Sequence, residues 1–172
     1  MQALLSSLLL CLLLAWRTAQ ADVLGDVQNL MARGELVTAL SVAQTAARKD
    51  PRDAQAGFLQ GVVLMELQRN DEALAAFQRF SQAYPELPEP YNNMALLHVR
   101  SGRLELARQA LESALRNDPA HRAARANLGE VHLMLAVQAW ERASSSGPLD
   151  ARLMRKLDAA RALVASGAGG GQ

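Results

Sequence analysis

The stretch YPELPEPYNNMALL, residues 84–97, places three prolines within six residues, directly before an amphipathic run. Its first proline belongs to a regular series, because Pro51, Pro85 and Pro119 follow one another at a constant interval. Proline cannot continue a helix, but it fits well in the first turn of a new one. We therefore expect Pro85 to follow one helix and the two later prolines to start the next. The stretch is predicted to be a stiff corner and not a linker between domains.

Other positions repeat at the same interval as these prolines. The matching sets are Ala39, Ala73 and Ala107; Ala43, Phe77 and Leu111; Ala46, Phe80 and Ala114; and the turn residues Gly34, Gln68 and Gly102. Small residues let two helices approach closely, and large ones fill the space between helix pairs. A 34-residue period of helix–turn–helix units is the signature of the tetratricopeptide repeat. The sequence therefore resembles the tetratricopeptide repeat (TPR) family over most of its length.

The composition agrees with a helical fold. Half of the 172 residues are apolar, yet only 4% are aromatic, and isoleucine is absent. Alanine and leucine, which favour helices, supply most of the apolar residues, whereas strand-favouring residues are scarce. We expect an all-α protein, and the resemblance implies an α-solenoid of antiparallel helix pairs.

The repeat divides the chain into three regular units and an irregular end. The regular units are expected at residues 20–53, 54–87 and 88–121. The fourth unit starts in register, but Gly129 and Ala136 are only 7 residues apart, where the second unit has 12 between Gly61 and Ala73. No glycine or proline lies between the first two. A turn is therefore missing, and one long helix is predicted from about residue 122 to residue 144.

The chain is expected to end in a cap and a tail. The serine-rich break after the degenerate fourth unit, residues 122–146, precedes a last helix predicted at residues 150–165. Its apolar face would hold Leu149, Leu153, Leu157 and Val164. A solenoid needs a terminal element with a polar outer face, so this segment is predicted to be a capping helix. Residues 166–172, rich in glycine, are expected to be disordered.

Residues 1–21 have the pattern of a secretory signal peptide. An apolar core is followed by Ala19-Gln20-Ala21, a small-x-small motif that predicts cleavage after Ala21. The apolar run is short for a membrane span, which needs about 20 residues. The segment before it has no lysine or arginine, so an uncleaved inner-membrane anchor is the alternative. Cys11 follows Leu10, where a lipobox needs a small residue, so a lipid anchor is not expected.

The chain that remains after cleavage is neutral. It keeps 17 basic and 17 acidic side chains, and it loses the only cysteine. A neutral chain has no global field that attracts nucleic acid, so no nucleic-acid partner is expected. Without cysteine, no disulfide, thiolate nucleophile or thiolate metal site is possible.

The resemblance implies a ligand groove. In TPR proteins the first helices of the pairs line a concave surface that usually binds a peptide or a helix of another protein. Transferring the groove-lining positions to this sequence gives ten candidate ligand-binding residues: Phe58, Val62, Met65, Asn92, Asn93, Leu96, Arg100, Asn127, Glu130 and Met134. Their mixture of apolar, amide and charged side chains suits a peptide with apolar anchors and does not suit a phosphate backbone.

Asn93 and Asn127 are separated by one period of the repeat and admit two interpretations. They resemble the amide ladder by which some TPR proteins hold a peptide backbone, since an amide both donates and accepts hydrogen bonds. The alternative is that each amide bonds to a neighbouring helix, as most buried side-chain amides find local partners. The positions of the carboxylate clamp in chaperone-binding TPR domains hold no cation. When the clamp is placed to start in the first unit, its positions hold Leu24, Gln28, Leu59, Glu89 and Asn93.

Metal binding, cofactors and catalysis are not expected. His98 and His132 occupy the repeat position that packs between helices, so both are predicted to be packing residues. No phosphate-binding loop, nucleophile elbow or zinc-protease motif occurs in the sequence. The chain is therefore predicted not to be an enzyme.

The sequence favours two functions. The first is an exported bacterial adaptor or scaffold that binds a protein or peptide partner in its groove, in the periplasm and in cell-envelope assembly. The second is a structural subunit that self-associates, or docks in a membrane-anchored complex, through its C-terminal helices. Trp140 is expected to distinguish them: a buried indole favours the groove, and an exposed one favours an interface at the C-terminal end. Membrane contact is expected only if the signal is uncleaved.

Overall fold

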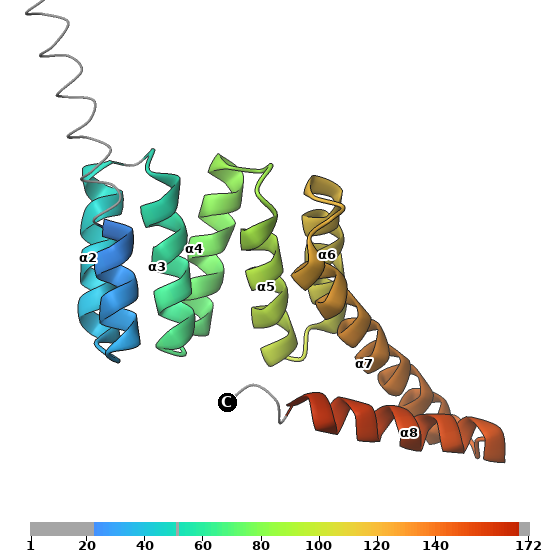
Figure 1. The fold of residues 1–172 in the computed structure, drawn as a ribbon. Helices are drawn as coiled ribbons and strands as arrows, with labels where there is room; N and C mark the ends of the chain where they lie inside the picture. Colours follow the sequence, from blue (N-terminus) through green and yellow to red (C-terminus); the bar gives the residue numbers. More distant parts are fainter. Residues whose placement is uncertain (1–22, 51, 169–172) are drawn as a thin grey trace, which may run out of the picture. The chain divides into compact units, whose positions relative to one another are not determined.

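The computed structural model describes residues 23–50 and 52–168. These residues divide into two compact units, one that ends at Tyr84 and one that begins at Pro85. The first unit contains a helix at residues 23–32, α2 (Leu36–Lys49), α3 (Ala54–Glu66) and α4 (Asn70–Ala83), and the second contains α5 (Pro88–Arg100), α6 (Leu104–Asn117), α7 (Arg122–Ser146) and α8 (Ala151–Ala168) (Figure 1). No strand occurs among the described residues, so the predicted all-α class is confirmed.

In the first unit, α3 lies between α2 and α4 and packs on both. Its start is fixed by Asp53, whose carboxylate accepts hydrogen bonds from the backbone N–H groups of Gln55 and Ala56 at 2.9 and 3.1 Å. Such a cap satisfies two of the N–H groups that have no partner within the helix. Phe77 of α4 is fully buried against Gly61 of α3, because the missing side chain of the glycine leaves space for the ring.

The three turns of the repeat share one backbone conformation. Gly34, Gln68 and Gly102 have φ angles of 75°, 57° and 70°, in the left-handed region. Each lies between the two helices of a pair, as the period of the sequence predicts. Glycine adopts this conformation without cost, but Gln68 carries a side chain that disfavours it.

The proline corner opens the second unit. Pro88 stands in the first turn of α5, as predicted from the sequence. The carbonyl oxygen of Pro85 accepts hydrogen bonds from the Tyr91 hydroxyl at 3.2 Å and from Asn117 Nδ2 at 2.7 Å. The start of this unit is therefore held to both α5 and α6.

Small and branched residues form the core of α5, α6 and α7. This core consists of Ala95, Ala107, Leu111, Ala114, Ala124 and Val131, each exposed by at most 1%. The prediction that α7 is one long helix is confirmed, since it runs unbroken through 25 residues. Its first turn is capped by His121, whose Nδ1 accepts a hydrogen bond from the Ala124 N–H at 3.0 Å.

α8 ends later than the sequence predicted. It continues to Ala168, so residues 166–168 of the expected tail are helical. The rest of that tail, residues 169–172, lies outside the described residues, as do the predicted signal peptide, residues 1–21, and Pro51. The expected apolar face of α8 buries Leu157, which is 3% exposed, and half-buries Leu149, Leu153 and Val164.

Candidate ligand-binding surfaces

Three candidate residues belong to the first unit and lie on α3. Phe58, Val62 and Met65 are all half-buried. The Phe58 ring packs against Phe77 and Phe80 of α4, with centroid distances of 5.6 and 5.8 Å and tilted planes. Tilted aromatic pairs at this separation are mutually attractive. Phe58 therefore contributes to the packing of α3 on α4.

Four candidates lie on α5 in the second unit. Asn92, Leu96 and Arg100 follow one another at intervals of four residues and therefore share one side of the helix. Asn92, Asn93 and Leu96 are half-buried, and Arg100 is exposed. This side of α5 therefore carries an amide, an apolar group and a cation.

The remaining candidates lie on α7. Asn127 and Met134 are half-buried, and Glu130 is exposed. Asn127 Nδ2 donates a hydrogen bond of 2.9 Å to Oδ1 of Asn92 on α5. Its amide group thus has a partner on a neighbouring helix, as expected if the amides bond locally and do not form a ladder for a peptide. That partner is Asn92 and not Asn93.

α8 lies against the same side of α7. Arg161 of α8 donates from Nε and Nη2 to Oε1 of Glu141, at 3.0 and 2.8 Å. Nearer the start of α7, a Cβ atom added to Gly167 would lie 3.7 Å from Oε2 of Glu130. The candidate residue Glu130 is therefore a neighbour of α8. Glu141 was not among the ten candidate residues predicted from the sequence. It could have been found, because it stands seven residues after Met134, an interval that keeps both on one side of a helix.

The opposite side of α7 carries Gly129 and His132. Both are exposed, and a Cβ atom on Gly129 would meet nothing within 4 Å. The expectation that His132 packs between helices is wrong, because the helix that would follow α7 in a regular unit is fused into α7 itself. The equivalent His98 on α5 does pack, with 9% of its surface exposed.

His98 is the one buried polar side chain among the described residues. Its Nδ1 has no hydrogen-bond partner there. Burial, and to a lesser degree the positive charge of Arg103, lowers the pKa of His98 below the ordinary value of 6.5. The imidazole is therefore held neutral near pH 7. Among the described residues no three histidine, cysteine or acidic side chains are grouped to hold a metal ion.

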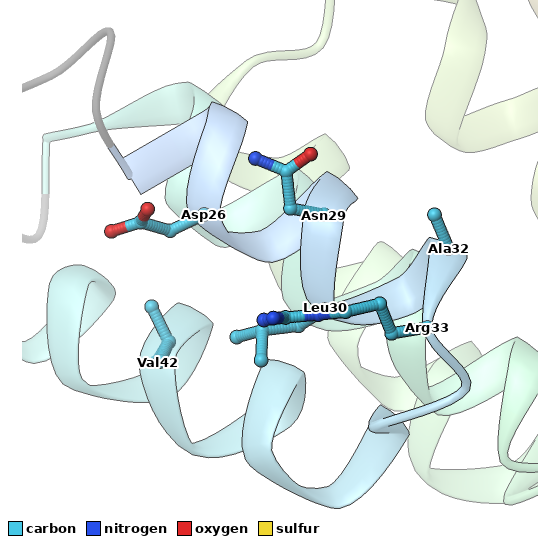
Figure 2. A pocket seen from close by; sticks show the side chains of 6 residues that line it. All are labelled: Asp26, Asn29, Leu30, Ala32, Arg33 and Val42. Carbon is cyan, nitrogen blue, oxygen red and sulfur yellow. The ribbon is translucent and has the colours of Figure 1, made fainter.

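Two hollows in the first unit were not predicted. One, of about 510 Å³, opens between residues 23–32 and α2 and is lined by Asp26, Asn29, Leu30, Ala32, Arg33 and Val42 (Figure 2). Arg33 Nε is already paired with Glu35 Oε1 at 3.2 Å. The other, of about 160 Å³, lies among α2, α3 and α4 and includes Asp53, Gly57 and Phe80. No motif or repeat position indicates either hollow.

Trp140 does not separate the two expected functions. It is half-buried near the middle of the second half of α7, neither enclosed nor fully open to solvent. The larger exposed apolar groups of this end belong to α8, where Met154 is 48% and Leu163 59% exposed.

Comparison with known families agrees with the repeat. The tetratricopeptide repeat model matches residues 25–88 and 92–135, well over half of the chain. The chain therefore belongs to the tetratricopeptide repeat family. No match was found among curated proteins.

Solved structures with a similar fold are also TPR proteins. The first TPR of Spaghetti (RPAP3), bound to the HSP90 peptide SRMEEVD, has a TM-score of 0.62 and 14% identity, covering 68% of this chain and 93% of that one. PcrH of Pseudomonas aeruginosa, with the chaperone binding region of PopD, has a TM-score of 0.60 and 19% identity, covering 73% and 95%. A TPR protein of Thermus thermophilus has a TM-score of 0.54 and 30% identity, covering 59% and 52%.

Within the described residues, no helix is both long enough and apolar enough to cross a membrane.

Proposed function

We propose that this chain is a TPR adaptor that binds a segment of a partner protein along the side of α5 and α7 that carries Asn92, Leu96, Arg100 and Met134. The observation that carries the proposal is that this side combines half-buried amide and apolar groups with an exposed cation, Arg100. Such a mixture can hold a peptide backbone and one or two apolar anchors. The similar structures that contain an HSP90 peptide or the chaperone binding region of PopD support the binding of a protein segment by this fold.

The ligand of this surface differs from an acidic chain terminus. A carboxylate clamp requires cations at fixed positions, and those positions hold Leu24, Gln28, Leu59, Glu89 and Asn93. Leu59 is buried, so it also lacks an exposed group to offer. We therefore expect an internal segment of the partner and not its C-terminal carboxylate.

The test is affinity capture with two charge variants of equal size. Arg100→Glu changes the proposed surface, whereas Arg79→Glu makes the same charge change on the exposed side of α4. We expect a partner that is captured by the unaltered chain and by Arg79→Glu and lost with Arg100→Glu. The captured protein is then purified, and its Kd is measured for all three chains. Equal binding to all three would exclude this surface.

The place of action is part of the same proposal. The signal-like residues 1–21 support export to the bacterial periplasm and a role in cell-envelope assembly. The alternative is a chain held at the inner membrane by an uncleaved signal. Fractionation of cells that express the full chain, followed by N-terminal sequencing, tests both: a periplasmic chain that begins at Asp22 supports export and cleavage, and a membrane-bound chain that retains Met1 supports the anchor.

A second candidate function rests on α8. Met154 and Leu163 are exposed apolar side chains on this helix, and exposed apolar groups favour association. In this reading the chain self-associates or docks as a structural subunit. Replacing both residues by serine would then lower the mass measured by light scattering, while the unaltered chain would form an oligomer.

A further inference from the structure

α8 covers part of the surface on α7 to which the proposed function assigns a ligand. Glu130 approaches Gly167 near the end of α8, and Glu141 binds Arg161 near its middle. Residues 11 apart in a helix lie on the same side and about 16 Å from each other along the axis. Met134 stands between the two glutamates on that side. The three residues Glu130, Met134 and Glu141 define what we term the α7 surface.

α8 presents a matching stripe. Leu157 and Ala160 are its buried side chains, with 3% and 4% of their surface exposed, and Val164 and Gly167 continue the stripe at intervals of three and four residues. Small groups at two of these four positions allow the helix axes to approach closely. The arginine beside the stripe then meets a carboxylate of α7.

Few interactions hold α8 against α7. Only two of its described side chains are buried, and the ion pair with Glu141 is half-exposed on both partners, at 50% and 45%. Exposed ion pairs contribute little to stability. The connection between α7 and α8 runs through Gly147 and Pro148, both exposed. An element with few buried contacts belongs to the parts of a protein that open first.

We propose that α8 is a detachable internal ligand of the α7 surface, and that this surface accepts in its place a partner helix of the same chemistry. That helix has a leucine and a small residue three positions apart on its apolar side, followed directly by an arginine that pairs with Glu141. The inference rests on the proposed function, because it names the class of partner for the same side of α7. While α8 stays in place, Glu141 is paired with Arg161 and does not bind the arginine of a partner helix.

The test uses the full chain and a fluorescein-labelled synthetic peptide of residues 149–168 as the probe. An opened chain carries Leu157→Asp and Arg161→Ala, which place a carboxylate on the apolar side of its own α8 and remove the ion pair with Glu141. A control chain carries Arg155→Glu, a charge reversal on an exposed position of α8. Circular dichroism checks that the helix content of the opened chain falls by no more than the length of α8. We expect the opened chain to bind the probe at least tenfold more tightly than the unaltered and control chains do.

The ion pair is tested separately. A probe with Arg161→Glu is expected to bind the opened chain at least tenfold more weakly, and Glu141→Arg in the opened chain is expected to restore its binding. Because residue 161 of the opened chain is alanine, its own α8 cannot pair with the new arginine at position 141, and restored binding comes from the probe alone. Restored binding places the probe on α7 beside residue 141. Equal binding of the probe by all chains, or binding by none, would overturn the inference.

Failure here is distinguishable from failure of the adaptor function. If the opened chain binds the probe but no partner is captured through Arg100, the adaptor function is wrong and the inference stands. If a partner is captured equally by the unaltered and opened chains, the adaptor function stands, and the competition between α8 and the partner is wrong.

Discussion

Gly61 lies directly against the ring of Phe77. A Cβ atom on Gly61 would stand 2.6 Å from Cε1 and 2.7 Å from Cζ of this ring, closer than any real contact. One period later the same two positions hold Ala95 and Leu111, both buried. The second and third repeats therefore solve the same packing problem in two ways, with a glycine under a ring or with an alanine under a branched chain.

Gly61→Ala is expected to destabilise the first unit. The added methyl group forces the ring of Phe77 or the backbone to move, and such overpacking costs about 1–3 kcal/mol. Urea unfolding followed by circular dichroism measures this loss. Gly57→Ala is the matched control on the same helix, because its added Cβ would lie 3.3 Å from Phe80 and requires only a small adjustment.

The pair Gly61→Ala and Phe77→Leu reproduces the residues of the third repeat. Phe77→Leu alone leaves a cavity and is expected to cost about 1–3 kcal/mol by the lost burial. The double variant should be clearly more stable than the sum of the two losses predicts, since each change removes the problem that the other creates. If the two losses simply add, the ring of Phe77 does not restrict the size of the side chain at position 61.

A second prediction concerns the one turn of the repeat that lacks glycine. Gln68 has a φ angle of 57°, where a side chain costs about 1 kcal/mol relative to glycine. Gln68→Gly is therefore expected to raise the free energy of unfolding by about 0.5–1 kcal/mol, after the greater entropy of glycine in the unfolded chain is counted.

The control for Gln68→Gly is the reverse change at an equivalent turn. Gly102 has a φ angle of 70°, and nothing lies within 4 Å of a Cβ added there. Gly102→Ala should therefore lower the free energy of unfolding by about 1 kcal/mol through backbone strain alone. A loss of stability with Gln68→Gly would contradict the prediction and would indicate that the glutamine side chain makes a compensating contact.

The regular part of this fold was predictable because one period controls several independent features. Prolines, small residues and turn residues all repeat with that period, so each supports the same boundaries. The long α7 was predictable from the five residues missing between Gly129 and Ala136. The side of α7 on which α8 packs was not predictable. The buried residues of α8, such as Leu157 and Ala160, could pack against any apolar neighbour. The exposed His132 and the partner of Asn127 also depend on tertiary placement, which the period does not specify.

A third prediction concerns pH and His98. Its pKa in the folded chain lies below the value of about 6.5 expected in the unfolded chain. In the interval between the two values the unfolded chain binds the proton and the folded chain does not, so acidification favours unfolding. The contribution of neutral His98 to the stability of the second unit is therefore fully present above the unfolded value of about 6.5. This contribution is lost as the pH falls from there through the folded pKa.

His98→Leu isolates this contribution. The substitution keeps a similar volume and removes the buried Nδ1 that has no partner among the described residues. Urea unfolding at pH 7.5, 6.5 and 5.5 measures both chains, and the carboxylates that titrate below this range are common to them. The difference in stability between the variant and the unaltered chain should grow in favour of the variant as the pH falls. A constant difference would show that His98 has the same pKa in both states.

The fourth prediction separates packing from ligand binding at the amide pair of Asn92 and Asn127. Their hydrogen bond of 2.9 Å joins α5 to α7 between two half-buried side chains. Asn127→Ala removes the donor and leaves Oδ1 of Asn92 without it. We expect a loss of about 0.5–1.5 kcal/mol in the free energy of unfolding, the range found for single hydrogen bonds.

The double variant Asn92→Ala and Asn127→Ala decides the role of the pair. If the two amides bond only to each other, the second substitution lowers the free energy of unfolding little once the first is made. The double-mutant cycle then gives a coupling of about 0.5–1 kcal/mol. Binding to the captured partner would then fall only as far as the packing of α5 on α7 is disturbed. If instead the amides serve a ligand, each single variant keeps its stability and weakens the Kd separately. Asn93→Ala is the internal reference, because Asn93 lies on the same helix next to Asn92. A loss of binding confined to Asn93→Ala would assign the ligand contact to the amide that lies outside the Asn92–Asn127 hydrogen bond.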